Sequence, residues 1–211
     1  MTKIKLCGLS ESCDIGAVNE LQPDYIGFVF APKSTRYVSP EKVATLKGLL
    51  SPSVKTVGVF VREKPENVAR LLENGTIDIA QLHGGESEDY IRQLRGLSGK
   101  PLIKAFRVDT KEDVKAANIC SADYVLLDSG QGGTGKVFDW ELLAEINRPY
   151  FLAGGLNADN VRNAIDLLHP YAVDVSSGIE TDGHKDVDKM AAFMRAAGKN
   201  RHTHTKGVSQ T

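Results

Sequence analysis

Four residues of types used in acid–base and anion-binding chemistry follow short apolar runs of the sequence: Cys7, Arg36, His83 and Asp128. A thiol, an imidazole and a carboxyl group can each exchange a proton with a substrate, and a guanidinium can hold an anion through parallel hydrogen bonds. Each residue also has an ordinary interpretation, namely a small buried thiol, a surface charge, a local hydrogen bond or a turn cap. The glycine-rich segment 129–139 after Asp128 is typical of a loop that covers a site.

Two turns rich in small residues predict a site for a phosphate. Gly154 and Gly155 form the first turn, and Ser176, Ser177 and Gly178 form the second, one predicted helix later. Residues without large side chains let a ligand approach the backbone closely, so the N–H groups of both turns can point at one anion. Two ordinary turns between strand and helix are the alternative interpretation.

The elements that must position these residues alternate between short strands and helices. We expect strands at residues 4–6, 25–30, 54–61, 77–82, 102–106, 124–127, one ending near 152, and 172–175. We expect helices at residues 10–21, 39–50, 65–73, 87–94, 110–117, 140–146, one ending near 168, and 186–197. The alternation predicts a parallel sheet, and eight units favour closure, so the expected fold class is α/β, a single-domain (β/α)8 TIM barrel.

The expected barrel domain covers residues 1–198, and the polar residues 199–211 form a tail that we expect to be disordered. In a barrel of this kind the active site lies at the C-terminal ends of the strands, and the loops after strands 7 and 8 form the usual phosphate site. The thiol, the guanidinium, the imidazole and the carboxyl group are therefore expected to converge on the phosphate site.

The composition excludes several classes of partner. Lys and Arg number 26 against 27 Asp and Glu, which gives a formal net charge of -1 and no extended basic surface for nucleic acid or an anionic membrane. No apolar run approaches the length of a membrane span. The three cysteines cannot all pair and match no zinc spacing, so we expect a cytoplasmic protein with free thiols. With no long exposed apolar strand, we expect a monomer.

No cofactor is expected from the sequence. The five histidines form no HExxH pattern, and there is neither a Walker loop nor a GxGxxG pattern with a following acidic residue. We therefore expect neither a bound metal nor a nucleotide cofactor, and we expect a small phosphorylated molecule as the partner of the predicted phosphate site.

Seven segments together resemble the phosphoribosylanthranilate isomerase family: KLCGL (5–9), GFVFAPKSTRYV (27–38), VGVFV (57–61), QLHGGE (81–86), LLDSGQGGTGKVFDW (126–140), LAGGLNADNV (152–161) and VDVSSGIE (173–180). Single segments are only moderately specific, but their combination and order are highly specific. The resemblance implies an enzyme of tryptophan biosynthesis that converts N-(5-phosphoribosyl)anthranilate to 1-(2-carboxyphenylamino)-1-deoxyribulose 5-phosphate by an Amadori rearrangement without a cofactor.

The resemblance also implies a role for single residues. Cys7 matches the general base of the family, Asp128 its general acid, and Arg36 its ligand for the anthranilate carboxylate. His83 and Asp174, which lie in matching segments, join the two small-residue turns as expected substrate-binding residues.

Two other functions remain open at this point. The related isomerase of histidine biosynthesis handles a substrate with a phosphate at each end and uses carboxylates as both acid and base, with an Asp at the position of Cys7. The loop after the third strand, Arg62-Glu63-Lys64, has no glycine and offers no second phosphate turn. A non-catalytic phosphate-binding barrel would keep residues 151–180 but would not need Cys7, Asp128 and Arg36 together.

Overall fold

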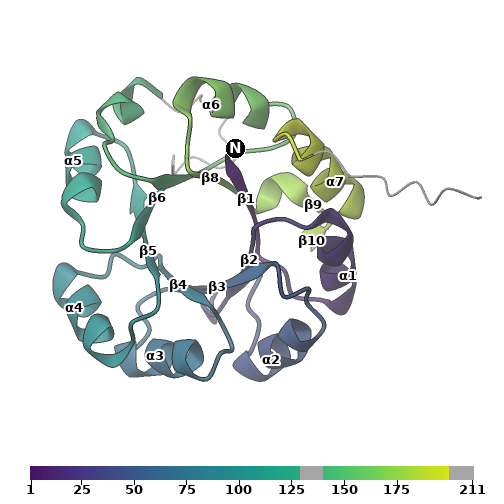
Figure 1. The fold of residues 1–211 in the computed structure, drawn as a ribbon, viewed down its shortest axis with the longest axis horizontal. Coiled ribbons are helices and arrows are strands. Elements are labelled where there is room, and N and C mark those ends of the chain that lie inside the picture. The colour runs from purple at the N-terminus through teal and green to yellow at the C-terminus, as the bar shows by residue number, and fades with distance from the viewer. Residues whose placement is uncertain (129–139, 200–211) are drawn as a thin grey trace, which may run out of the picture.

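Eight parallel strands form a closed ring in the computed structural model of the protein, which describes residues 1–128 and 140–199 (Figure 1). The strands are β1 (Lys3–Cys7), β2 (Tyr25–Val29), β3 (Lys55–Phe60), β4 (Ile79–Leu82), β5 (Leu102–Arg107), β6 (Tyr124–Asp128), β7 (Tyr150–Ala153) and β8 (Ala172–Val175). Each strand pairs with the next, and pairing of β1 with β8 closes the ring. The predicted (β/α)8 barrel is confirmed.

Helices surround the ring on its outer side (Figure 1). They are α1 (Ser12–Leu21), α2 (Pro40–Gly48), α3 (Pro65–Glu73), α4 (Glu88–Leu97), α5 (Lys111–Ile119), α6 (Val161–Leu168) and α7 (Val187–Ala196). No helix in the described part of the chain is long and apolar enough to span a membrane. Between β6 and β7 the helical segment is a 3-10 helix, η1 (Trp140–Glu145), where we expected an ordinary helix. Pro149 disfavours helical backbone at Arg148, and so short a segment readily adopts 3-10 geometry.

Side-chain chemistry at the helix starts explains several of these boundaries. The Ser39 hydroxyl accepts a hydrogen bond from the backbone N–H of Lys42 and Pro40 occupies the first turn of α2, as the sequence predicts. Thr110 caps α5 in the same way, and its backbone N–H donates to the Asp113 carboxylate. These caps satisfy N–H groups that a helix start leaves without partners.

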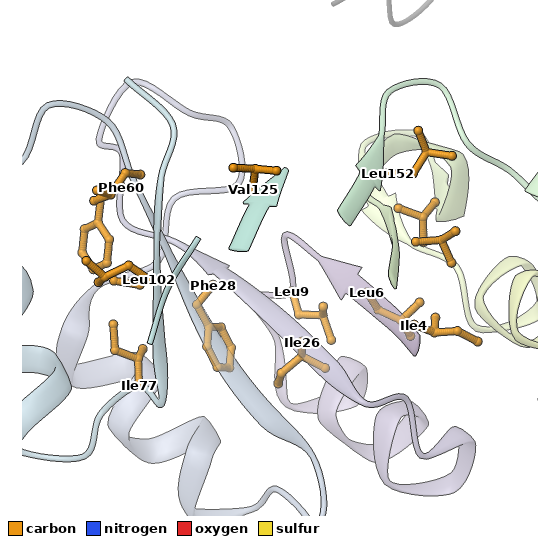
Figure 2. Packing of buried hydrophobic residues seen from close by; sticks show 14 of the residues in the cluster. Ile4, Leu6, Leu9, Ile26, Phe28, Phe60, Ile77, Leu102, Val125 and Leu152 are labelled. Atoms are coloured by element: carbon orange, nitrogen blue, oxygen red, sulfur yellow. The ribbon is translucent and has the colours of Figure 1, made fainter. Parts of the chain in front are cut away.

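Alternate strand residues face opposite sides of the barrel wall. In β1, Ile4 and Leu6 point outward and are fully buried against the helices, whereas Lys5 and Cys7 point inward. Figure 2 shows the outward layer: Ile4, Leu6, Leu9, Ile26, Phe28, Phe60, Ile77, Leu102, Val125 and Leu152. Fully burying one such side chain stabilises the fold by about 1.5–3 kcal/mol, so this layer fixes which residues of every strand face inward.

The interior of the barrel is packed from its N-terminal end up to the level of Cys7. Tyr25, Tyr124, Phe151 and Tyr171 form an aromatic cluster at that end, with ring centroids 5.0 to 5.8 Å apart. An inward-facing apolar group contains Tyr25, Val57, Ile79, Ile103, Leu126, Phe151, Ala153 and Ala172. Nearer the C-terminal ends, Cys7 packs with Val29 and Val59. Because these side chains fill the lower part of the described barrel, the space inside it opens at the C-terminal ends of the strands.

A short hairpin that the sequence analysis did not predict follows β8 and the 3-10 turn η2 (Ser177–Ile179). Its strands β9 (Glu180–Thr181) and β10 (His184–Lys185) are antiparallel. Asp182 and Gly183 join them with positive φ values of 50° and 81°, as the two central residues of a type I′ turn require. The dipeptide Asp-Gly is a strong hairpin signal, so the sequence did contain the information.

Candidate active site

A cavity of about 340 Å³ at the C-terminal ends of the strands brings the predicted site residues together. The predicted residues that line it are Cys7, Arg36, His83, Asp128, Gly154, Gly155, Asp174, Ser176 and Ser177. The sequence analysis missed the other lining residues, which are Val29, Ser34, Val59, Gln81, Ala153, Leu156 and Val175. A cavity of this size suits a small-molecule ligand.

Gly178 is the predicted site residue that does not line the cavity. A Cβ atom at this position would lie 2.0 Å from the Leu156 carbonyl oxygen and 3.1 Å from its carbonyl carbon. The turn after β8 can therefore lie against the turn after β7 only if residue 178 is glycine. Gly178 thus allows the two turns to pack against each other, although it does not itself line the cavity.

Cys7 ends β1 with its thiol at the base of the cavity and only 8% of its surface exposed. On the neighbouring strand its partner is Gly27, where a Cβ atom would lie 2.5 Å from Cys7 Sγ. The thiol therefore occupies space that a side chain at residue 27 would fill. Gly27 is a determinant of the site that the sequence analysis did not identify.

An ion pair lies inside the barrel next to Cys7. Lys5 Nζ donates a hydrogen bond of 2.9 Å to Asp174 Oδ2, and Lys5 is completely buried. Burial raises the pKa of the Cys7 thiol above its usual value, the Lys5 charge opposes this effect, and the Asp174 charge adds to it. For Lys5 itself, burial lowers the pKa, but Asp174 and Cys7 together raise it above its usual value. Because its pKa is raised, the thiol is mostly protonated at neutral pH.

One oxygen of the buried Asp174 carboxylate is unused. Asp174 Oδ1 has no hydrogen-bond partner among the residues that the structure describes, although its side chain lines the cavity. A buried acceptor without a donor is costly, which makes this oxygen a site for a hydroxyl or N–H group of a ligand.

Asp128, at the end of β6, lies beside His83. His83 Nε2 is 3.9 Å from Asp128 Oδ2, and Gln81 Nε2 is 3.0 Å from His83 Nδ1. Burial is the largest effect on His83 and lowers its pKa, so the ring is neutral at pH 7. With the Gln81 amide nitrogen as the donor, Nδ1 accepts this hydrogen bond and the ring proton lies on Nε2. The glycine-rich segment that we expected to cover the site, residues 129–139, lies outside the described residues.

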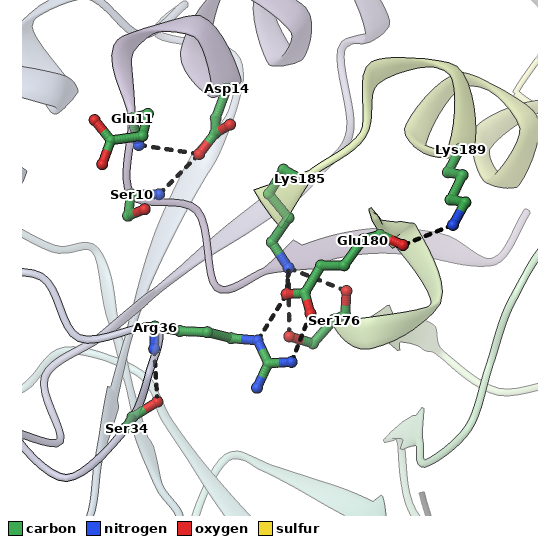
Figure 3. Close-up of polar contacts among 9 residues, drawn as sticks. All are labelled: Ser10, Glu11, Asp14, Ser34, Arg36, Ser176, Glu180, Lys185 and Lys189. Atoms are coloured by element: carbon green, nitrogen blue, oxygen red, sulfur yellow. Dashed lines mark hydrogen bonds and ion pairs between the residues drawn. The ribbon is translucent and has the colours of Figure 1, made fainter. Parts of the chain in front are cut away.

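Arg36 reaches the cavity from the loop after β2, and Glu180 of the hairpin holds its side chain (Figure 3). Arg36 Nε and Nη2 donate to the two oxygens of Glu180, both at 2.7 Å. Lys185 Nζ donates to Glu180 Oε1 at 2.6 Å. Burial alone raises the pKa of Glu180, but the hydrogen bonds from Arg36 and Lys185 lower it below its usual value. The sequence analysis predicted Arg36 but neither of these partners.

The first small-residue turn depends on backbone that only glycine adopts readily. Gly154 and Gly155 have φ values of 92° and 64°, and a Cβ atom on Gly155 would meet nothing within 4 Å. Asn160 Nδ2 donates to the Gly155 carbonyl oxygen at 3.0 Å and so fixes the turn to the start of α6.

Among the described residues no three His, Cys, Asp or Glu side chains gather to hold a metal ion.

Comparison with known proteins connects this site to one family. The sequence model of N-(5'-phosphoribosyl)anthranilate isomerase matches residues 4–196. A protein of that name from Endomicrobium trichonymphae is 46% identical over 199 residues, which cover 92% of this chain and 98% of the relative.

Solved structures agree with the sequence comparison. The isomerase of Thermotoga maritima superposes with a TM-score of 0.85 at 40% identity, covering 93% of this chain and 98% of that one. Another structure, in complex with reduced 1-(o-carboxyphenylamino)-1-deoxyribulose 5-phosphate, superposes with a TM-score of 0.82 at 38% identity over the same shares. The chain therefore belongs to the family of N-(5'-phosphoribosyl)anthranilate isomerases, the isomerases of tryptophan biosynthesis.

Proposed function

We propose that this cavity isomerises N-(5'-phosphoribosyl)anthranilate to 1-(2-carboxyphenylamino)-1-deoxyribulose 5-phosphate, with Cys7 as the general base and Asp128 as the general acid. The observation that carries the assignment is that one cavity is lined by a thiol, a carboxyl group, a guanidinium and the two small-residue turns. An acid, a base and a binding group for each charged end of the substrate are what this rearrangement needs.

Each charged end of the substrate binds to a different group of the cavity. The phosphate binds to the backbone of the two turns, Gly154, Gly155, Ser176 and Ser177, which Gly178 packs together. The anthranilate carboxylate binds to Arg36, whose planar guanidinium can offer it two parallel hydrogen bonds. Between these anchors the sugar lies over Cys7 and Asp128.

The reaction then needs two proton transfers and no cofactor. Asp128 gives a proton to the oxygen of the furanose ring, and the ring opens to a protonated Schiff base. The Cys7 thiolate removes the proton from the neighbouring sugar carbon, which gives an enolamine that tautomerises to the ketone. The unpaired Asp174 Oδ1 accepts a hydrogen bond from a sugar hydroxyl, and neutral His83 donates from Nε2 toward the substrate.

Replacement of the two proposed catalytic residues tests this assignment. Cys7→Ser and Asp128→Asn should each lower kcat by about 10²–10⁴-fold, the usual contribution of an acid or base. Cys13→Ser, which removes an exposed thiol, is the matched control and should keep full activity. Loss of substrate fluorescence measures turnover, and circular dichroism measures folding. A folded Cys7→Ser protein with more than roughly a tenth of the wild-type kcat would sink the assignment.

We also infer a monomer that works in the cytoplasm on a small phosphosugar, without nucleic acid or a membrane. The three cysteines Cys7, Cys13 and Cys120 are all free thiols, as a reducing compartment favours. The large apolar side chains that are exposed come from different parts of the chain, for example Leu97 at the end of α4 and Ile119 at the end of α5. A solved structure from Thermotoga maritima, at 39% identity, is of monomers generated from a dimeric isomerase. Light scattering after size-exclusion chromatography distinguishes the two states, and a dimer at micromolar concentration would contradict the inference.

A further inference from the structure

Glu180 occupies only one edge of the Arg36 guanidinium. A guanidinium carries five N–H groups, and Glu180 accepts from Nε and from one N–H of Nη2. Nη1 makes no hydrogen bond to any described residue, and Figure 3 shows it pointing away from Glu180. The edge formed by Nη1 and the second N–H of Nη2 therefore stays open to a second carboxylate. Arg36 can bind Glu180 and a substrate at the same time.

Glu180 is itself held firmly by the hairpin. Its side chain is 9% exposed, and Lys185, whose side chain is 3% exposed, donates to its Oε1. Lys189 Nζ donates to the backbone carbonyl of Glu180 at 2.7 Å (Figure 3). Because the acceptor is fixed in space, the plane and direction of the Arg36 guanidinium are fixed with it.

The stem of Arg36 is confined from the other side. A Cβ atom on Gly8 would lie 2.6 Å from Arg36 Cδ, so the aliphatic stem passes directly over the backbone after β1. The Arg36 backbone N–H also donates to Ser34 Oγ at 3.1 Å. With its stem lying on Gly8 and its head held by Glu180, this long side chain has little freedom left to lose when a ligand binds.

The same hairpin reaches the second small-residue turn. Lys185 Nζ donates to the Ser176 carbonyl oxygen at 3.0 Å and lies 3.5 Å from Ser176 Oγ. Lys185 therefore joins the residue that holds Arg36 to the turn proposed to bind phosphate. Arg36, Lys185 and Glu180 together keep one net positive charge, which favours an anionic ligand.

We infer that Glu180 is a positioning residue that aims the open edge of Arg36 at the carboxylate of the substrate, with Lys185 fixing Glu180 to the phosphate turn. The inference rests on the proposed function of Arg36. The opposite view is that Glu180 competes with the substrate for Arg36 and must leave first. The two views predict KM changes of opposite sign when Glu180 loses its charge. Removal of a competitor lowers KM, whereas removal of a positioning group raises it.

Glu180→Gln tests the inference, since Gln keeps the shape of the side chain but not its charge. We expect KM for N-(5'-phosphoribosyl)anthranilate to rise at least about tenfold, with kcat changed only a few-fold. The reason is that a well-aimed Arg36 stabilises the bound substrate and the transition state to the same extent. Turnover of N-(5'-phosphoribosyl)aniline, which lacks the carboxylate, should change little. Glu145→Gln, at the end of η1 and paired with Lys111, is the matched control for loss of an ion-paired carboxylate.

Two further variants separate the possible failures. Lys185→Gln leaves the Glu180–Arg36 pair in place and should raise KM by a smaller factor, which keeps the test available if Glu180→Gln does not fold. In Arg36→Met the further change Glu180→Gln should add almost nothing to KM, because the two residues act as one unit. A lower or unchanged KM in folded Glu180→Gln overturns the inference. An unchanged KM in Arg36→Met would instead overturn the proposed role of Arg36.

Discussion

Lys5 Nζ lies 2.9 Å from Asp174 Oδ2, and this ion pair, of which Lys5 is completely buried, stands next to the thiol of Cys7. Moving two charges out of water costs desolvation free energy, and this cost can exceed the gain from their mutual attraction. A buried ion pair is therefore weak evidence for stability alone. Its position suggests a second role, because the Lys5 charge is the largest effect that lowers the pKa of Cys7 while Asp174 raises it.

Replacement of the two partners should move the Cys7 pKa in opposite directions. Lys5→Met removes the charge that favours the thiolate and should raise the thiol pKa further, whereas Asp174→Asn should lower it. The rate of Cys7 alkylation by iodoacetamide at several pH values, with the modified peptide quantified by mass spectrometry, measures both shifts. Shifts in the same direction would show that the pair does not tune the thiol.

Activity should rise with pH above neutrality. Burial holds the pKa of the Cys7 thiol above its usual value, so the thiolate fraction grows about tenfold per pH unit below that pKa. The lowered pKa of His83 means that its change of charge occurs below the usual range of histidine and adds no rise above pH 7. The measurement is kcat/KM between pH 6 and 9, and a profile that is flat from pH 6 upward would contradict a thiolate base.

A methyl group at residue 27 should disturb catalysis more than stability. In Gly27→Ala the new Cβ would lie 2.5 Å from Cys7 Sγ, so the thiol must move. We expect kcat to fall by about 10²-fold, because displacement of a reacting group by about 1 Å has an effect of that size. Gly16→Ala in α1 is the control, since its Cβ would meet nothing within 4 Å, and it should stabilise the fold by roughly 0.5–1 kcal/mol. Equal kcat in both variants would argue against a precise thiol position.

A large side chain at Gly155 should exclude the phosphate. Gly155→Leu places a side chain in the open space of the cavity and should raise KM for the phosphorylated substrate. The positive φ of 64° adds strain of about 1–2 kcal/mol that lowers stability separately. Gly75→Leu carries the same kind of strain at φ 76°, in the turn after α3, and therefore isolates it. If both variants bind substrate like the wild type, the phosphate site lies elsewhere.

The sequence by itself determined the architecture and most of the cavity lining. Strict alternation of strands and helices requires a parallel sheet, and a residue at the C-terminal end of a parallel strand must lie on the active face. The structure agrees with this expectation, because Leu6 and Leu127 are buried in the outer layer while the next residues, Cys7 and Asp128, line the cavity. The order of strands and the residue that ends each strand are local properties of the chain, which is why the sequence predicted them, whereas the role of each site residue came from the family resemblance.

Only the tertiary structure decided which partners meet. Lys5 and Asp174 are 169 residues apart and become neighbours because β1 pairs with β8, and Arg36 meets Glu180 across 144 residues. The effect of Gly27 on Cys7 likewise depends on the register of β1 against β2. A local pattern fixes the face on which a side chain lies, but the charge, burial and space around it come from segments that only closure of the barrel brings together.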